Sequence, residues 1–476
     1  MFNFNRVISQ KKAKNLYMGT LILLTTIGFN IMRGMRETVI FQFGKNGALY
    51  TPFIRIMCIL PISALLFVYY LSIKKRTNTL IAYYALTVPL LLYFITYGLF
   101  SAPGVINTET MPVWITSWIE IYPPLEFIAG ITIHWDKTLY YVFCEAWGSF
   151  TLVILFWQIA NETYTPKQAS KYYPIFSMLG GAGIIISSLL IKKMGKYENI
   201  TLITTEIITL IGICNLWLVT KIWQQKKENS DIKHKQKISI SMKEGIKMAL
   251  STPHILYLTT CIISFSILCN VYENAVRNII LNHYGTEQEV FKFWGNFFFG
   301  KGLLVISANI ISKALLKRVG WFYVAITTPI ISIISIHLIL SIPSFQIDPH
   351  AMANTQNVLW GLAILLQLNF AVKYAFFDPT KEMAYIPLND EQRTYGKTVA
   401  DGVGSRIGNI SSGMVQSIAI IAAAGNDFTQ IAPILLGICS IISLGWIWAI
   451  TGLSKTYNQM TSEKNTPPLS LVKEKV

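Results

Sequence analysis

The sequence predicts an all-α polytopic membrane protein with about twelve transmembrane helices in two six-helix halves. The 476 residues are 53% hydrophobic and only 13% charged, with a mean hydropathy of +0.46. Soluble domains carry about 25% charged residues, so this chain has too little charge to cover a water-facing surface of its size. Its apolar residues also gather in runs of about 20, the length that crosses a bilayer. These observations exclude a soluble enzyme, a disordered chain and a secreted disulfide scaffold.

Twelve apolar segments are long enough to span a membrane. They cover about residues 17–39, 49–72, 79–101, 138–160, 172–191, 200–221, 253–277, 291–312, 320–341, 355–377, 404–425 and 430–452. Each holds roughly 20 mainly apolar residues, which a helix needs to cross the hydrocarbon core.

A hydrophilic stretch between the sixth and seventh spans divides the chain. It predicts an N-terminal six-helix half over 1–223, a cytoplasmic linker over 224–250, a C-terminal six-helix half over 251–454 and a cytoplasmic tail over 455–476. The segment 102–135 is rich in Trp, Pro and Tyr. We expect it to form an external loop or surface helix at the headgroup level, where amphipathic aromatic side chains settle.

Most of the formal net charge of +16 reflects orientation in the membrane. With the N-terminus inside, 27 of the 40 Lys and Arg residues fall on cytoplasmic segments and six on external ones. Cytoplasmic loops carry the excess of Lys and Arg in membrane proteins, so both termini are expected on the cytoplasmic side of the cell inner membrane. No basic folded domain is expected outside the membrane, which argues against a nucleic acid as partner. The six cysteines lack metal-ligand spacing, so no disulfide, metal or cofactor is expected.

Seven basic residues remain, and all lie within or at the ends of predicted spans. They are Arg33, Arg36, Arg55, Arg277, Lys301, Lys373 and Arg406. An Arg or Lys near the bilayer centre costs at least about 2.5–3.5 kcal/mol, so these side chains are expected to face the interior of the helix bundle. Internal salt bridges and snorkelling at helix ends are one explanation. Arg55 and Lys301 are interpreted as the best candidates for snorkelling.

Intramembrane acids are fewer than the cations. The clear cases are Glu37, Glu145, Glu273, Asp378 and Asp401. Because the surplus is positive, a water-filled cavity that attracts an anion is the sharper hypothesis.

Two short patterns indicate an internal repeat. Asn30-x-x-Arg33-x-x-x-Glu37 lies in the first span, and Asn270-x-x-Glu273-x-x-x-Arg277 lies in the seventh. Both place opposite charges at i and i+4 on one helical face, with the charge order reversed. In the same way Glu145 of the fourth span matches Lys373 of the tenth. Equivalent helices of two halves commonly line one site at the midplane, although two short matches can also arise by chance.

Glycine-rich segments give weaker signals. Gly295-x4-Gly300-Lys301-Gly302 is similar to a phosphate-binding loop, but it lacks the final Ser or Thr and lies in an apolar segment without a preceding strand. The run from Gly402 to Gly408 is better interpreted as a small-residue helix-packing surface. The six histidines are scattered, without a metal or triad pattern.

One segment is far more specific, and it runs from Lys373 through Asp378, Pro379, Lys381 and Glu382 to Leu388. It resembles the signature of the ATP:ADP antiporter family of plastids and intracellular bacteria. Other matches follow in order along nearly the whole chain. They are Asn30 to Thr38, Glu145 to Ser149, Phe156 to Asn161, Lys171 to Phe176, Asn270 to Glu273, Gly295 to Phe297, Gly396-Lys397, Arg406 to Gly408, and Gln416.

The resemblance implies a twelve-helix transporter of the major-facilitator type that exchanges nucleotides, usually ATP for ADP, with phosphate as a co-substrate in some members. It also implies roles in transport for four charged residues, which are Arg36, Glu145, Glu273 and Lys397. Together with the charge analysis, the expected substrate-binding set is Arg33, Arg36, Glu145, Glu273, Arg277, Lys373, Asp378, Lys381, Lys397 and Arg406. The expected partners are ATP and ADP and the lipid bilayer, with other nucleotides, phosphate or protons as candidate co-substrates. The protein is expected to act as a monomer.

The sequence also departs from the family pattern. Arg36 stands where the family usually has Lys, and Glu37 where it usually has Asp; Gly181, Tyr395 and Asn409 replace polar or cationic residues. The guanidinium fork of Arg suits phosphate oxygens better than a point ammonium does. These changes leave nucleotide preference open, so proton-coupled import, or exchange of GTP or NAD, is the alternative to ATP/ADP exchange. A membrane-embedded enzyme acting on a phosphorylated substrate is a weaker alternative. Tyr141, Tyr272 and Tyr374 are candidates for stacking on the base, with ordinary helix packing as the alternative for each.

Overall fold

The structure is a computed structural model that describes residues 2–44, 46–100, 113–227, 251–344, 355–424 and 427–465. Within these ranges the regular secondary structure is helical throughout. Most of the predicted linker, the end of the predicted tail and the first part of the expected 102–135 loop lie outside the described residues.

The first part of the chain forms long helices joined by short turns. Its elements are α1 (Phe2–Val39), η1 (Ile40–Phe43), α2 (Gly47–Ile54), η2 (Arg55–Ile59), α3 (Leu60–Arg76), α4 (Thr79–Phe100), α5 (Val113–Ile121), α6 (Leu125–Ile133), α7 (Trp135–Gly148), η3 (Ser149–Phe156), α8 (Trp157–Thr163), α9 (Pro166–Met194) and α10 (Ile200–Lys227). The described part of the predicted external loop is the short helix α5 followed by α6. Trp118 and Ile121 are exposed on α5.

The second part of the chain has the same character. Its elements are α12 (Pro253–His283), α13 (Glu287–Val319), α14 (Trp321–Ser344), α15 (Thr355–Val372), η4 (Lys373–Phe377), α16 (Asp378–Ala384), α17 (Asp390–Lys397), η5 (Thr398–Gly404), α18 (Ser405–Ala423) and α19 (Phe428–Asn465). Helix α18 ends at Ala424, which takes a left-handed conformation (φ 48°).

Eleven of the twelve predicted spans are confirmed as helices that are long and apolar enough to cross a membrane, counted over the described residues. The twelfth, predicted over 404–425, is the helix α18. It falls outside the eleven because polar residues, among them Arg406, Asn409 and Gln416, dilute its apolar content. The all-α membrane architecture predicted from composition is therefore correct.

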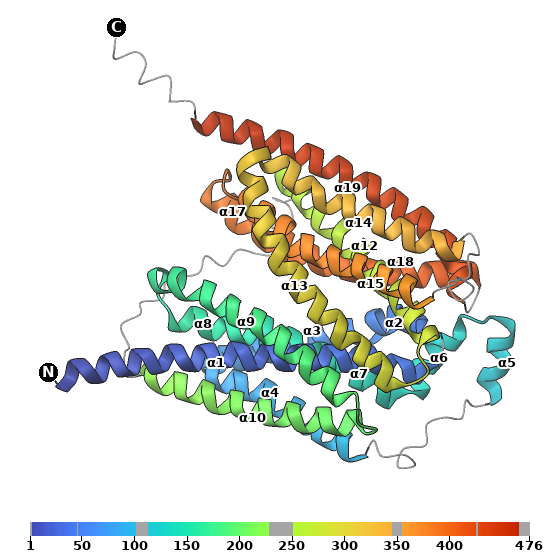
Figure 1. The fold of residues 1–476 in the computed structure, drawn as a ribbon, viewed down its shortest axis with the longest axis horizontal. Helices are drawn as coiled ribbons and strands as arrows, with labels where there is room; N and C mark the ends of the chain where they lie inside the picture. Colours follow the sequence, from blue (N-terminus) through green and yellow to red (C-terminus); the bar gives the residue numbers. More distant parts are fainter. Residues whose placement is uncertain are drawn as a thin grey trace, which may run out of the picture. The chain divides into compact units, whose positions relative to one another are not determined.

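The described helices divide into two compact units. The first contains residues 1–235 together with 280–302, and the second contains 236–279 together with 303–476. Two helices are shared between units, because α12 changes unit after Ile279 and α13 changes unit after Gly302. In Figure 1, α12 is the yellow-green helix and α13 is the darker yellow one.

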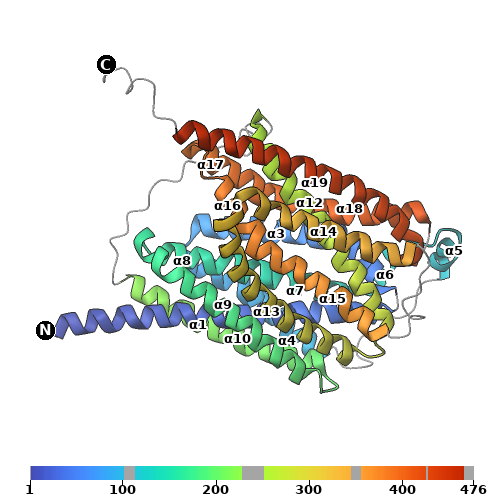
Figure 2. The same ribbon diagram turned by 45° about the horizontal axis from the view of Figure 1, so that its top comes forward.

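Helix α1 is the central element of the first unit. It packs against α7, α9 and α10, and Figures 1 and 2 both show α1 alongside α9 and α10. The first part of α13 is held on α9 by small residues. A Cβ atom added at Gly295 would lie 2.9 Å from Ile191 and 3.2 Å from the carbonyl oxygen of Ser188. This close approach explains why residues 287–302 pack with the first unit.

In the second unit α14 packs along α19, and α18 also contacts α19. Helix α12 is tied to its neighbours by His254, whose two ring nitrogens lie 2.7 Å from Thr456 Oγ1 and 2.8 Å from the Ala384 carbonyl oxygen. Large apolar side chains remain exposed on the outer helical faces, as on α18 at Ile407, Met414 and Ile418. Faces of this kind suit a hydrocarbon surrounding.

Four spans change from α- to π-helical geometry part of the way along. The π segments are η2, η3, η4 and η5. Such widened turns are rare and frequently occur at functional sites. Two of them adjoin the pair matched in the sequence, since η3 begins four residues after Glu145 and η4 begins at Lys373.

Candidate functional site

Arg36 is the centre of an ion-pair cluster in the first unit. Its guanidinium bonds to the carboxylates of Glu37 and Glu145, and its Nε donates to Glu37 across 2.9 Å. Tyr141 lies beneath it, with the ring centroid 5.7 Å from the guanidinium carbon. Because Glu37 is fully buried, its charge depends on Arg36. The cluster brings together residues of α1 and α7, two of which were predicted site residues.

A second group of cations in this unit lies around the buried ring of Phe298. The Arg33 guanidinium carbon is 5.8 Å from the ring centroid and Lys301 Nζ is 5.0 Å from it. Lys301 is only 4% exposed and lies in the middle of the span Glu287–Leu316. The prediction that Lys301 snorkels from a helix end is therefore wrong, because its side chain is buried beside Phe298 in the middle of the span. Arg55 is half-buried at the start of η2.

Glu273 and Arg277 form the corresponding pair in the second unit. They lie 3.8 Å apart at i and i+4 on α12, which confirms the spacing argument for this pair. Arg277 is 2% exposed and donates a 2.7 Å hydrogen bond to Asn274 Oδ1. Asn274 in turn donates to Gln416 Oε1 across 2.8 Å, and Gln416 donates to the Ser412 carbonyl oxygen. A buried polar chain thus runs from Arg277 on α12 into α18.

Small residues bring α12 and α18 together, as predicted for the glycine-rich run. A Cβ atom at Gly408 would lie 2.6 Å from Ser266 Cβ, and one at Gly404 would lie 3.1 Å from Thr259 Cγ2. Arg406 is exposed within its unit. It lies on a helical stripe with Asn409, whose Oδ1 accepts a 3.0 Å bond from Asn270, while the apolar residues of α18 follow a different stripe. The cation therefore does not share the face that suits lipid.

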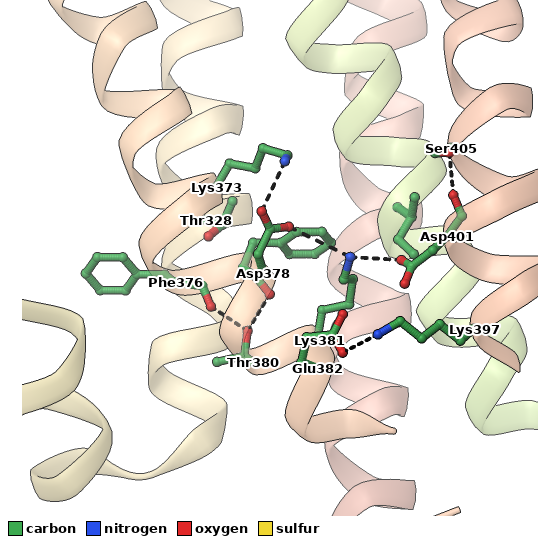
Figure 3. Close-up of polar contacts among 12 residues, drawn as sticks. Thr328, Lys373, Phe376, Asp378, Thr380, Lys381, Glu382, Lys397, Asp401 and Ser405 are labelled. Atoms are coloured by element: carbon green, nitrogen blue, oxygen red, sulfur yellow. Dashed lines mark hydrogen bonds and ion pairs between the residues drawn. The ribbon is translucent and has the colours of Figure 1, made fainter. Parts of the chain in front are cut away.

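An extended ion-pair chain lies where α16 meets η5 (Figure 3). Lys373 donates to Asp378 across 3.1 Å, and Lys381 is 3.9 Å from the other Asp378 oxygen. Lys381 is also 2.8 Å from Asp401. Two cations and two carboxylates thus alternate in one chain. Three of the four are predicted site residues, and Asp401 is the addition.

Lys397 lies next to this chain but makes a separate pair. It donates to Glu382 across 2.7 Å, and both side chains are about half exposed. Tyr385 is buried nearby, with Lys397 Nζ 5.8 Å from its ring centroid. Burial first, and then the neighbouring carboxylates of Asp401 and Glu382, raise the pKa of the Tyr385 phenol well above its usual value. The phenol therefore stays neutral beside the cations.

The structure distributes the predicted site residues over both units. Glu145, Arg33 and Arg36 lie in the first, and the other seven lie in the second. The predicted site set left out Asn274, Gln416 and Glu382. Asn274 could have been found from its polar character inside an apolar span, and Gln416 and Glu382 from their places in the matched family motifs.

The aromatic candidates separate by their surroundings. Tyr272 is buried and donates to the Leu362 carbonyl oxygen across 2.9 Å, which is a packing role. Tyr141 is buried beneath Arg36. Tyr374 is exposed within its unit, with Lys373 Nζ 4.3 Å from its ring centroid. Of the three, Tyr374 is the exposed ring.

The glycine motif around Lys301 lies inside the uninterrupted helix α13. A phosphate-binding loop needs a strand–loop–helix context that exposes backbone N–H groups, and a continuous helix does not provide it. Gly295 of this motif instead packs closely against α9.

Comparison with known proteins decides the family. The sequence model described as TLC ATP/ADP transporter matches residues 3–457. The chain belongs to the TLC ATP/ADP transporter family. Relatives in this family include ADP,ATP carrier protein 3 of Rickettsia bellii (strain RML369-C), 26% identical over 476 residues that cover 93% of this chain and 94% of the relative. ADP,ATP carrier protein 3 of Rickettsia prowazekii (strain Madrid E) is 26% identical, covering 92% and 93%.

Solved structures show the fold of this TLC family member. A point mutant of the nucleoside transporter NupG matches with a TM-score of 0.56 at 11% identity, covering 92% of this chain and 99% of NupG. A bacterial homologue of the iron transporter ferroportin in an inward-facing state matches at 0.55 and 15%, covering 92% and 98%. At these identities the likeness concerns architecture alone, and it is the major-facilitator type that the sequence resemblance implied.

Proposed function

We propose that this protein is a nucleotide antiporter that exchanges ATP and ADP by alternating access. The observation that carries the proposal is the match of the TLC ATP/ADP transporter family over residues 3–457. The described structure adds intramembrane Arg and Lys side chains in both units, and carboxylates pair with Arg36, Arg277 and Lys381. A structural membrane protein would not need cations that are this costly to insert.

The chemistry of the clusters suits phosphate groups. Arg36 and Arg277 present planar forks that make paired hydrogen bonds to phosphate oxygens, and such charge-assisted bonds are about twice as strong as neutral ones. In the structure the carboxylates of Glu145, Glu273 and Asp378 hold the cations. Binding then exchanges one anionic partner for another, which avoids leaving a bare charge in the membrane.

The proposal includes a location and an orientation. The protein acts as a monomer in the cell inner membrane, with both termini in the cytoplasm. The excess of Lys and Arg on one set of loops supports this orientation.

Counterflow tests the function directly. Purified protein in liposomes loaded with ADP, or left empty, is given labelled ATP outside. We expect uptake into loaded liposomes and almost none into empty ones, because exchange needs an internal substrate. Uptake into empty liposomes that follows an inward proton gradient would contradict exchange and indicate symport. Competition by unlabelled ATP, ADP, GTP, NAD and phosphate then ranks the substrates.

A further inference from the structure

We propose that Asp401 is the carboxylate with which a nucleotide phosphate competes for Lys381, and that this competition makes the return of the empty carrier slow. The inference rests on the proposed exchange function. It identifies Asp401 as a positioning residue that controls how strictly efflux of one nucleotide depends on the other, and that does not itself bind the substrate.

Lys381 lies between two carboxylates that come from different segments (Figure 3). Asp378 is on its own helix α16, 3.9 Å away, whereas Asp401 is on η5, 2.8 Å away. The stronger contact is therefore the one between segments. Lys381 is 15% exposed and Asp401 25%, so solvent screens this pair less than it screens a surface pair.

The Lys381–Asp401 pair links two parts of the second unit. It joins the end of the α15–α16 span to the segment that leads into α18, twenty residues later in the chain. Within its own segment, the backbone carbonyl oxygen of Asp401 accepts a 2.5 Å bond from Ser405 Oγ. The Lys397–Glu382 pair joins α16 to the end of α17, but both of its side chains are half exposed, and exposed pairs contribute little. The more buried pair is the main electrostatic link.

A phosphate and the Asp401 carboxylate compete for the same ammonium group. Both are anions, and placing them together on one lysine brings like charges close, which is unfavourable where solvent is limited. A phosphate that binds Lys381 therefore displaces Asp401 and breaks the link between the segments. When the nucleotide leaves, the pair forms again. A carrier whose segments are tied in this way reorients slowly without cargo, which is the property that exchange requires.

Competition also lowers the apparent affinity for the nucleotide. When a ligand must first break an internal pair, its apparent affinity is its intrinsic affinity multiplied by the fraction of protein in which that pair is already broken. Removing the competing charge in Asp401→Asn should therefore strengthen binding and weaken coupling at once. A residue with only a structural role would not produce this combination, because damage to the site weakens binding.

The experiment compares Asp401→Asn with the wild-type protein in liposomes. Labelled ADP is loaded inside, and its efflux is followed into medium with and without external ATP, while ADP binding to the purified protein is measured by titration. We expect Asp401→Asn to bind ADP several-fold more tightly and to release it several-fold faster into nucleotide-free medium. Asp401→Glu, which keeps the charge, should restore dependence on external nucleotide. Asp427→Asn is the matched control on an exposed carboxylate that bonds Thr429, and it should behave as the wild type.

The outcomes separate this inference from the proposed function. If the wild-type protein does not exchange ATP and ADP, the proposed function fails. If the wild type exchanges while Asp401→Asn binds ADP no more tightly or still requires external nucleotide for efflux, only the role of Asp401 is overturned. Should Asp401→Asn not be recovered as folded protein, Asp401→Ser removes the same charge and is judged by the same two measurements.

Discussion

Arg277 donates a 2.7 Å hydrogen bond from Nη1 to Oδ1 of Asn274, three residues earlier on α12. The guanidinium is almost fully buried, and Asn274 connects it to Gln416 on α18. The amide therefore orients a charge that has little access to water. Its neighbour Glu273, at 3.8 Å, is the carboxylate in the same group.

Removing this amide should destabilise the protein. Asn274→Ala takes away a hydrogen bond to a buried charge, which costs about 1.5–3 kcal/mol. We expect a lower midpoint of thermal unfolding for the purified protein. Asn309→Ala is the matched control, because Asn309 is exposed and bonds only within its own helix, to the Val305 carbonyl oxygen. An equal loss in both variants would contradict the role given to Asn274.

Arg36→Ala should abolish nucleotide uptake. It removes the fork that bonds Glu37 and Glu145, and breaking a buried pair leaves an uncompensated charge at a cost of about 3–5 kcal/mol. Adding Glu37→Gln should recover protein level and thermal stability without recovering uptake. Arg318→Ala, at an exposed site near the end of α13, should transport normally. Normal uptake by Arg36→Ala would refute its role in binding.

Lys301→Met tests whether the buried lysine contributes to anion attraction. Methionine keeps the apolar contact with Phe298 but removes the charge that lies 5.0 Å from the ring centroid. Losing one charged contact of about 1.5 kcal/mol should raise the KM for ATP about tenfold, and Lys301→Arg should restore most of it. Lys313→Met, on the exposed side of the same helix, is the control. An unchanged KM in Lys301→Met would leave Lys301 as a packing residue.

Lys397→Ala should reduce transport without reducing thermal stability. The Lys397–Glu382 pair is half exposed, and exposed pairs contribute roughly 0–1 kcal/mol, so thermal unfolding should stay near that of the wild type. Transport should fall strongly, because the family resemblance implies a role for this lysine in transport. Measuring Tm and counterflow on one preparation checks both parts. A large fall in Tm with intact transport would reverse the interpretation.

Glu126, which lies outside the membrane spans, should make the stability of the protein depend on pH. Burial raises the pKa of its carboxyl, an effect partly offset by the hydrogen bond from Tyr50 at 3.4 Å. A raised pKa means that the folded protein favours the protonated carboxyl of Glu126. This group therefore stabilises the fold fully below the unfolded-state pKa of 4.5, and the stabilisation is lost as the pH rises through the folded-state pKa. Glu126→Gln should flatten the Tm-against-pH curve just above pH 4.5. An unchanged curve would show that another group sets it.

Much of the fold could be predicted from the sequence, because a helix that crosses a membrane needs an apolar run of about 20 residues. Eleven spans match apolar runs. Helix α18 is less hydropathic than these, because Arg406 and Asn409 lie on a polar stripe along it. The division of α13 between the units could not be predicted. It depends on the close packing of Gly295 against α9, which is a contact between distant residues.

The site was predictable where charge stands out against an apolar background. Arg36, Glu145 and Arg277 were found in this way, and their ion pairs follow from the cost of burying a lone charge. Lys301 was misjudged as a snorkelling residue, because the predicted span over 291–312 already places it near the middle of the membrane. The pairing of Lys381 with Asp401 needed the structure, since the segments involved are separated by a turn and a short helix.

The π-helical segments have a consequence for amide hydrogen exchange. A π turn has poorer geometry than an α turn and persists only where its surroundings hold it. In η4 and η5 those surroundings include the ion pairs of Lys373 and Asp401. Backbone N–H groups there should exchange with deuterium sooner than those of the flanking α15 and α18, and nucleotide should change their protection more than that of any neighbouring turn. Peptide-level mass spectrometry would then detect the breaking of these ion pairs by nucleotide as a change in the exchange of the backbone amides.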